Sequence, residues 1–424
     1  MISTSSDAGK GRSTVYNIFI ASFGNALEWF DFVVYGFFAP VIAKVFFPTG
    51  DQFTSLLLAT ASFGVPFLIR PLGALVIGRY ADRAGRKPAL TLTVLLMLVG
   101  TLIIALTPSF ATIGVFAPAL VVLARFIQGF SAGGEFGSAA AYLTEQSTTR
   151  RGYFGSWQFA SQSVTSILAA GVVWAIYANF TPAEIQAWAW RLPFLFGLLI
   201  GPVGLVMRRF MRESEEFIAA KRAPKPEPPR TATAGLWRGI LATAGLVAAG
   251  TVSAYVLILY LPTFAITQLH LPPTLAQSSA TIGAVLSLLA LPLAGALSDR
   301  VNRLRLMQTG LVLTSVAILP LFAWLLANPS FPRLLVCQLV MALTLSLYTG
   351  PLPALMAEVF PLRQRTFGMS VGYNLAVVVF GGFSPMVLTA LIHETNSDMA
   401  PAWYVLMAAL ISIASISSIA ARRK

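Results

Sequence analysis

Apolar runs long enough to cross a lipid bilayer recur along the whole chain. They cover residues 15–47, 53–77, 89–107, 112–143, 154–177, 189–210, 236–264, 274–298, 306–327, 332–356, 367–393 and 400–421. A membrane-spanning helix needs about 20 mainly apolar residues. Only 11% of the 424 residues are charged, against roughly 25% in an average soluble domain. The sequence therefore predicts an all-α integral membrane protein with twelve transmembrane helices, the first of which is too long to be a signal peptide.

The positive charges alternate with these apolar runs and predict the orientation of the chain. Most of the 29 Lys and Arg residues fall in the segments that are cytoplasmic if the N-terminus is inside, namely near residues 10–12, 79–87, 150–151, 208–238, 300–305, 363–365 and 422–424. The positive-inside rule then places both termini in the cytoplasm. We expect a multi-pass protein of a bacterial inner membrane. Because the charges are interrupted by spans, nucleic-acid binding is not expected.

Enzyme chemistry has no support in the sequence. Cys337 is the single cysteine, so no disulfide or thiolate metal site is possible within the chain. The two histidines, His270 and His393, are far apart and lack metal-ligand spacing. Zinc-hydrolase, phosphate-loop, nucleophile-elbow and dinucleotide motifs are not found. We predict no enzyme activity, no cofactor and no ATP-driven pumping.

Arg125 lies near the middle of the fourth apolar run. A charged side chain at the bilayer centre costs at least ~2.5–3.5 kcal/mol on insertion scales, and such residues usually mark functional sites. A guanidinium binds carboxylates with two parallel hydrogen bonds. The position predicts a carrier for an anionic substrate.

Two loop segments are similar and indicate an internal repeat. GRYADRAGRK at 78–87 matches GALSDRVNR at 295–303, with an offset of 217 residues. Glu145 and the pair 154–155 match Glu358 and the pair 367–368 with an offset of 213 residues. We therefore expect two homologous six-helix halves, 1–210 and 236–424, related by an axis along the membrane normal. The proline-rich segment 211–235 is the expected cytoplasmic linker.

The repeated loop resembles the signature of the major facilitator superfamily, and the similarity extends over essentially the whole chain. GNALEWFDF at 24–32, RPLG at 70–73 and RFIQGFSAGGE at 125–135 resemble the metabolite:proton symporter family. That family includes carriers of citrate, 2-oxoglutarate, shikimate and proline or betaine. SWQFASQ at 156–162, YLPT at 260–263, FGGFSP at 380–385 and PAWYVLM at 401–407 are most similar to citrate and tricarballylate carriers. The resemblance implies the major facilitator fold and alternating access around a midplane site.

Acidic residues on the first helix are the expected partners of the buried arginines. Asn25, Glu28, Asp31 and Tyr35 share one broad face of that helix, and Arg125, Gln128 and Glu135 share a face of the fourth helix. A substrate that captures Arg125 would release Glu28, Asp31 or Glu135 to accept a proton. The alternative is a static ion-pair network that only orders the bundle, and for Arg70 an inter-helix pair is an equal alternative.

Uncharged polar residues complete the predicted binding site. Gln158, Ser161, Gln162 and Thr165 form a hydrogen-bonding stripe on the fifth helix, which suits carboxylate oxygens. The second half offers Tyr255, Tyr260, Thr344, Tyr348, Tyr373 and Asn374, although aromatic residues in such helices are more often packing residues. We predict substrate binding by Arg125, Asn25, Gln158, Gln162, Tyr255, Tyr348 and Asn374.

The repeated loops are the expected gates. Gly78, Asp82, Arg83, Arg86, Asp299 and Arg300 are predicted to form a cytoplasmic charge clamp that holds the outward-facing state. The second loop has Asn302 where the first has Gly85, which predicts a weaker second clamp. Gly129, Gly133 and Gly137 repeat every four residues and predict close helix packing.

These features predict proton-coupled symport of a tri- or dicarboxylate, with citrate or tricarballylate favoured. The alternatives are symport of betaine or proline, or of 2-oxoglutarate or shikimate. A non-transporting sensor is a different class, but a sensor should carry a long soluble extension, and the predicted tails are short. The expected partners are the anionic carboxylate, protons and the lipid bilayer, and we expect a monomer.

Overall fold

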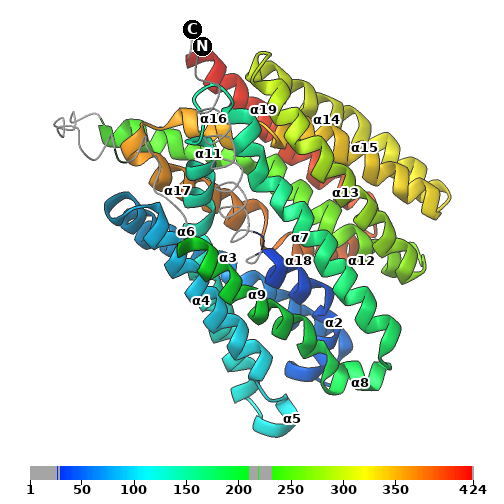
Figure 1. Cartoon of the computed structure of the whole chain (residues 1–424). Coiled ribbons are helices and arrows are strands. Elements are labelled where there is room, and N and C mark those ends of the chain that lie inside the picture. Colours follow the sequence, from blue (N-terminus) through cyan, green and yellow to red (C-terminus); the bar gives the residue numbers. More distant parts are fainter. Residues whose placement is uncertain (1–25, 27–28, 210–217, 219–231, 423–424) are drawn as a thin grey trace, which may run out of the picture.

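In the computed structural model, every regular element of the described chain is helical (Figure 1). The structure describes residues 26, 29–209, 218 and 232–422. Within them, 10 helices are long and apolar enough to cross a membrane, or up to 11 if the bent pair Trp29–Phe37 and Ala39–Phe46 is one span. The predicted span 189–210 contains a shorter apolar helix, Ala189–Leu199. The predicted total of twelve spans therefore stays a prediction.

We call the helices before the undescribed linker the first group and those after it the second group. The first group contains α2 (Ala39–Phe46), α3 (Gln52–Ala84), α4 (Arg86–Leu106), α5 (Phe110–Ile113), α6 (Phe116–Thr144), α7 (Arg151–Asn179), α8 (Pro182–Ala187), η1 (Ala189–Arg191) and α9 (Leu192–Arg209). The second contains α11 (Ala232–Ser253), η2 (Ala254–Tyr260), α12 (Leu261–Thr267), α13 (Pro273–Ser298), α14 (Arg303–Ala327), α15 (Phe331–Thr349), α16 (Leu352–Val359), η3 (Leu362–Gln364), α17 (Arg365–Phe380), α18 (Ser384–Thr395) and α19 (Ala400–Arg422).

The first span of each group is irregular just before a proline. In the first group the chain bends by 72° at Phe38, between Trp29–Phe37 and α2, and Pro40 is at the start of α2. In the second group, η2 is a π-helical segment and Pro262 follows it at the start of α12. Proline has no N–H for the helical bond, and its ring clashes with the carbonyl four residues earlier. The proline therefore disrupts each helix in the turn before it.

Each group is a helical bundle, and the two bundles contact each other mainly at two places. Within the groups, α3 and α4 pack on α6, while α13 and α14 pack on α15. Between the groups, α3 and α6 pack on α17, and α7 packs on α13. Figure 1 shows α7 crossing beside α13, and α17 beside α3 and α6. Any movement of one group against the other must change these two contacts.

The glycines of α6 allow two different neighbours to approach closely. A Cβ on Gly129 would lie 2.3 Å from the carbonyl oxygen of Pro66, and one on Gly133 would lie 2.1 Å from that of Arg70, both on α3. A Cβ on Gly137 would instead lie 1.9 Å from Ser370 Oγ on α17. The predicted close packing is confirmed. It joins α6 to its own group at Gly129 and Gly133, and to the other group at Gly137.

We expect Gly133→Ala to destabilise the protein, because the new methyl group would collide with backbone atoms of Arg70 and Ala74 at 2.1 Å and 2.7 Å. Overpacking of this kind costs about 1–3 kcal/mol. Thermal unfolding in detergent measures the effect. Gly171→Ala in α7 is the matched control, because nothing lies within 4 Å of its Cβ position. Equal melting temperatures for the two variants would contradict the packing argument.

Candidate functional site

Arg125 is fully buried among aromatic rings contributed by the first helix and α3. Its guanidinium carbon lies 4.1 Å from the ring centre of Tyr35, 4.8 Å from that of Phe32 and 5.7 Å from that of Phe63. Nη1 donates a hydrogen bond of 2.8 Å to Gln128 Oε1, one turn further along α6. Aromatic faces attract cations, most strongly when water is excluded. They stabilise the guanidinium here without neutralising its charge.

One edge of the Arg125 guanidinium is left without hydrogen-bond acceptors in the described part of the chain. Neither Nε nor Nη2 has a partner there, although both are buried. A buried donor without a partner costs about 1–3 kcal/mol, and more if it is charged. Nε and Nη2 lie on one side of the planar group, which is a side that a carboxylate can engage with two parallel bonds. The geometry therefore favours an anionic oxygen ligand.

Asp31 lies at the same level of the bundle and is held by donors from two other helices. Its Oδ2 accepts hydrogen bonds from Thr101 Oγ1 on α4 and from Gln128 Nε2 on α6, the latter at 3.2 Å. Its Oδ1 has no hydrogen-bond partner among the described residues. A Cβ on Gly197 of α9 would lie 3.0 Å from this Oδ1. The carboxylate is thus fixed at one oxygen and free of hydrogen bonds to described residues at the other.

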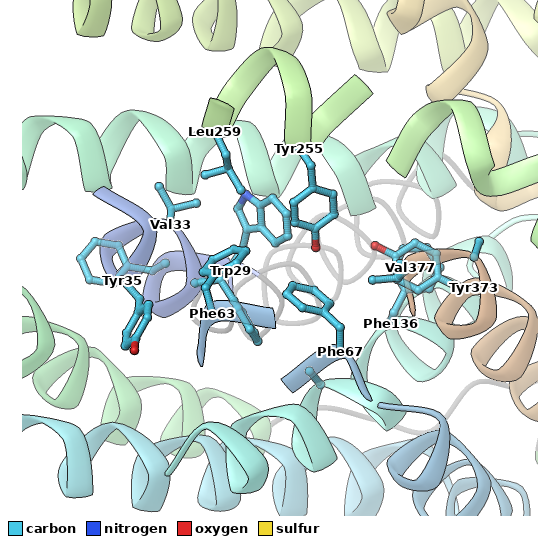
Figure 2. Close-up of a cluster of buried hydrophobic side chains, with 14 of the residues drawn as sticks. Trp29, Val33, Tyr35, Phe63, Phe67, Phe136, Tyr255, Leu259, Tyr373 and Val377 are labelled. Carbon is cyan, nitrogen blue, oxygen red and sulfur yellow. The ribbon is translucent and has the colours of Figure 1, made fainter. Parts of the chain in front are cut away.

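Arg70 extends the positive region toward the second group. Its guanidinium carbon lies 4.9 Å from the ring centre of Phe32 and 4.7 Å from that of Phe67, so Phe32 contacts both arginines. The predicted site residue Tyr255, on η2, packs edge-on against Phe67 with 5.5 Å between the ring centres. Figure 2 shows the hydroxyl groups of Tyr255 and Tyr373 turned toward the interior of this aromatic cluster. Tyr255 therefore joins the second group to the arginine region.

Glu135, another predicted acidic residue, lies apart from this cluster. Glu135 is buried and accepts a hydrogen bond from Thr93 on α4. It follows Arg125 by ten residues on α6, which corresponds to about 15 Å along a helix. Asn25 and Glu28 lie outside the described residues.

One end of the predicted polar stripe of α7 contacts the first helix through Thr165. Gln158 is buried, Gln162 is half-buried, and Thr165 Oγ1 donates a hydrogen bond of 3.0 Å to the carbonyl of Ala26. This bond places Thr165 beside the start of the described first span. This position is compatible with a lining role for Gln158 and Gln162.

The side chains of Tyr348 and Asn374, two predicted substrate contacts, donate to backbone carbonyls. The Tyr348 hydroxyl donates to the carbonyl of Leu246 within the second group. Asn374 Nδ2 donates to the carbonyl of Gly133 at 2.9 Å and to that of Ser370 at 2.7 Å. Asn374 thereby links α17 to α6. Beside it, Tyr373 stacks on Phe136 of α6 with 3.4 Å between the ring centres.

Asp299, one of the predicted gate residues, caps a helix of the other group. Its Oδ1 accepts a hydrogen bond of 2.8 Å from the N–H of Gly152, and its Oδ2 accepts one of 2.9 Å from the N–H of Tyr153. These are free N–H groups in the first turn of α7, where a negative charge is favourable. Arg303 bonds to Asp299 at 2.9 Å and also pairs with Glu358. A cap from the second group therefore holds α7.

A second contact between the groups lies at the start of α17. Arg365 Nη1 pairs with Glu145 Oε1 at 3.4 Å, and Arg365 Nε bonds to the carbonyl of Ala357. The Cβ position of the predicted gate residue Gly78 lies 3.7 Å from the Cα of Phe367. Of the remaining predicted gate residues, Asp82 is half-buried, Arg83 and Arg300 are exposed, and the side chain of Arg86 lies outside the described part.

The difference between Gly85 and Asn302 has a local cause. Gly85 precedes α4 with φ at 121°, a value that other residues rarely adopt. Asn302 precedes α14 with φ at −64°, and its side chain accepts a hydrogen bond from the N–H of Arg305. The second loop thus uses an ordinary N-cap instead of the glycine turn. The cap that Asp299 makes on α7 does not depend on this position.

Sequence reasoning missed the threonines that bind the carboxylates and the rings that surround the arginines. Thr93 and Thr101 are spaced by eight residues, the segment between them is apolar, and the spacing places both on one broad face. This pattern could have identified them. Phe32, Phe63 and Phe67 carry no comparable signal, because phenylalanines in a membrane helix usually pack against lipid or other helices.

Comparisons with known proteins agree with this architecture. The family model described as Sugar (and other) transporter matches residues 17–227, and that of the Major Facilitator Superfamily matches residues 244–423. A citrate-proton symporter of Salmonella typhi is 39% identical over 94% of this chain and 92% of its own length. A proline/betaine transporter of Escherichia coli (strain K12) is 35% identical over 96% of this chain and 83% of its own length.

The fold is also found in a solved transporter. The structure of the proton:xylose symporter XylE bound to 6-bromo-6-deoxy-D-glucose superposes with a TM-score of 0.81, covering 96% of this chain and 95% of that one at 15% identity. That identity supports a shared fold alone. Together with the bacterial relatives and the apolar helices, it indicates a multi-pass transporter of the bacterial inner membrane. The chain belongs to the major facilitator superfamily.

Proposed function

We propose that the chain is a proton-coupled symporter of a tri- or dicarboxylate, with citrate or tricarballylate as the favoured substrate. The observation that carries the proposal is the Arg125 edge formed by Nε and Nη2, which has no acceptor among the described residues and is fully buried. Hydrogen bonds to charged groups are worth about 1.5–3 kcal/mol each. A substrate carboxylate on this edge would satisfy both donors at once.

The aromatic cluster favours an anion over a zwitterionic osmolyte. Aromatic cages bind quaternary ammonium groups through the faces of their rings. Here Tyr35, Phe32 and Phe67 already have arginine guanidinium groups over their faces. A betaine ammonium group would have to displace a cation that belongs to the protein. The comparison with relatives supports the same choice: the citrate-proton symporter is 39% identical to this chain, and the proline/betaine transporter is 35% identical.

The proposed transport cycle uses two six-helix halves, 1–210 and 236–424, joined by the cytoplasmic linker 211–235. We propose twelve spans with both termini in the cytoplasm, and a monomer as the functional unit. The Asp299 cap and the Arg365–Glu145 pair join the halves at their proposed cytoplasmic ends. Rocking of the halves would break these contacts and admit the cytoplasm to the site.

Within this cycle, Arg125, Asn25, Gln158, Gln162 and Tyr255 are the proposed substrate contacts. Asp31 is the first choice for the proton, followed by Glu28 and Glu135. Asp31 is preferred because it shares the Gln128 side chain with Arg125. Tyr348 and Asn374 are further proposed substrate contacts, and their hydroxyl and amide groups also bond to backbone carbonyls.

The proposed function is tested by a substrate panel on the purified protein in proteoliposomes. We expect citrate or tricarballylate, but not betaine or proline, to raise the melting temperature and to accumulate under an inward proton gradient. Arg125→Lys should reduce citrate binding and uptake by at least roughly tenfold, because lysine keeps the charge but loses the planar pair of donors. Arg333→Lys is the control, since Arg333 bonds to the carbonyl of Trp324 near the end of α14. Normal citrate uptake by Arg125→Lys, or selective uptake of betaine, would refute the assignment.

Asp31→Asn should abolish gradient-driven accumulation while citrate exchange between vesicles and medium continues. Exchange needs only reorientation of the loaded carrier, whereas accumulation needs net proton movement. Glu135→Gln is the comparison, because Glu135 bonds to Thr93 and lies about 15 Å along α6 from Arg125. We expect a smaller loss of accumulation for Glu135→Gln. If Asp31→Asn still concentrates citrate, another group carries the proton.

Asp299→Asn should shift the carrier toward the inward-facing state. The substitution removes the negative charge from the first turn of α7, a contribution worth about 0.3–1 kcal/mol. A cysteine introduced at the start of α7, in a Cys337→Ser background, should become more reactive to a membrane-impermeant thiol reagent added from the cytoplasmic side. Asp398→Asn, in an exposed loop, is the control. Unchanged labelling in Asp299→Asn would remove this contact from the gate.

A further inference from the structure

Gln128 is the one described side chain that bonds to both Arg125 and Asp31. Its Oε1 accepts from Arg125 Nη1 at 2.8 Å, and its Nε2 donates to Asp31 Oδ2 at 3.2 Å and to Thr101 Oγ1 at 3.1 Å. Among the described residues, Arg125 and Asp31 form no direct ion pair, so their hydrogen-bonded connection runs through this amide. Gln128 is fully buried.

The chemistry of its neighbours fixes which way the amide faces. A guanidinium can only donate hydrogen bonds, and an ionised carboxylate can only accept them. The carbonyl of Gln128 must therefore face Arg125, and its NH₂ group must face Asp31. The reverse orientation would oppose donor to donor and acceptor to acceptor. The amide orientation thus depends on the state of both charged groups.

The stem of the side chain has little freedom. A Cβ on Gly100 of α4 would lie 2.5 Å from Gln128 Cγ and 3.0 Å from the carbonyl oxygen of Ala124. The missing side chain of Gly100 is therefore what admits Gln128 between α4 and α6. The stem is confined there, so rotation of the terminal amide is the movement that remains.

We propose that Gln128 is the positioning residue that links occupation of the substrate site to protonation of Asp31. The inference rests on the proposed function. A carboxylate that binds the Nε and Nη2 edge draws the guanidinium away from Gln128, and the amide is then free to rotate. Asp31 Oδ2 loses a donor that stabilised its ionised form, and the carboxylate accepts a proton more readily. When the substrate leaves, the hydrogen bonds of Gln128 to Arg125 and Asp31 form again and the proton is released.

The proton itself has a defined position in this scheme. Asp31 Oδ2 is already engaged by Thr101, so the new O–H bond forms on Oδ1, which has no partner among the described residues. The proton enters from the outer side and leaves to the cytoplasm. The charged or titratable groups that interact with Arg125 across this region are Asp31 and Tyr35 on the first helix, Arg70 on α3 and Tyr255 on η2.

The test replaces Gln128 by methionine, an unbranched side chain of similar length that cannot bond to Arg125 and Asp31 in this way. Gln128→Met and the matched control Gln338→Met are reconstituted in proteoliposomes with radiolabelled citrate. Gln338 is a buried amide on α15 that donates to the carbonyl of Leu257, in the other group. Two quantities are compared for each protein: citrate exchange without a gradient, and citrate accumulation under an inward proton gradient. The pH dependence of exchange is measured as well.

We expect Gln128→Met to lower accumulation by roughly tenfold relative to its own exchange rate, a loss within the usual range of coupling energies. Its exchange should also lose the pH dependence of the unmodified protein, and Gln338→Met should keep the native ratio. Two results would overturn the proposal: a native ratio in Gln128→Met, or an equal fall of exchange and accumulation in folded protein. Gln128→Leu repeats the comparison if Gln128→Met fails to fold. Failure of the proposed function is seen separately, as an unmodified protein that neither binds nor accumulates citrate.

Discussion

The burial of the Arg125 charge is the constraint on which the described site depends. The guanidinium is buried and lies over the rings of Tyr35 and Phe32, and among the described residues its hydrogen-bonded connection to Asp31 runs through Gln128. Aromatic faces lower the cost of burying the charge but leave its hydrogen-bond donors unused. A direct ion pair would have satisfied those donors permanently. The indirect arrangement keeps them available to a ligand while the carboxylate stays close enough to respond.

Helix α6, which carries Arg125, also transmits movement between the two groups. Gly129 and Gly133 bring α6 against α3, which carries Arg70, and Gly137 brings α6 against α17 of the other group. Asn374 then bonds to the carbonyl of Gly133 across this contact. A change in the angle between the groups must therefore act on the helix that carries Arg125, Gln128 and Glu135. The site and the contact between the groups are built on one helix.

The sequence predicted the class of fold because a bilayer leaves few solutions for an apolar chain, and helix positions follow from the length of each apolar run. It also indicated acidic residues of the first helix, Asp31 among them, as partners of the buried arginines, because helical spacing places them on one face. It did not reveal Gln128 as a link, since helical spacing places a side chain on a face but does not say which atoms it meets there. The aromatic surroundings of Arg70 and Arg125 were missed for the same reason. Tyr348 was predicted as a site residue from its residue type, and spacing alone could not show that its hydroxyl donates to the carbonyl of Leu246.

The π-helical segment η2 affects the direction in which the side chain of Tyr255 points. A π turn contains one residue more than an α turn, and such turns occur frequently at functional sites. Displacing the extra residue by one position along the span would rotate the intervening side chains by about 100° while leaving both ends of the span in place. The second group thereby has a way to redirect an aromatic side chain at the arginine region by a change of register, with no tilting of a whole helix.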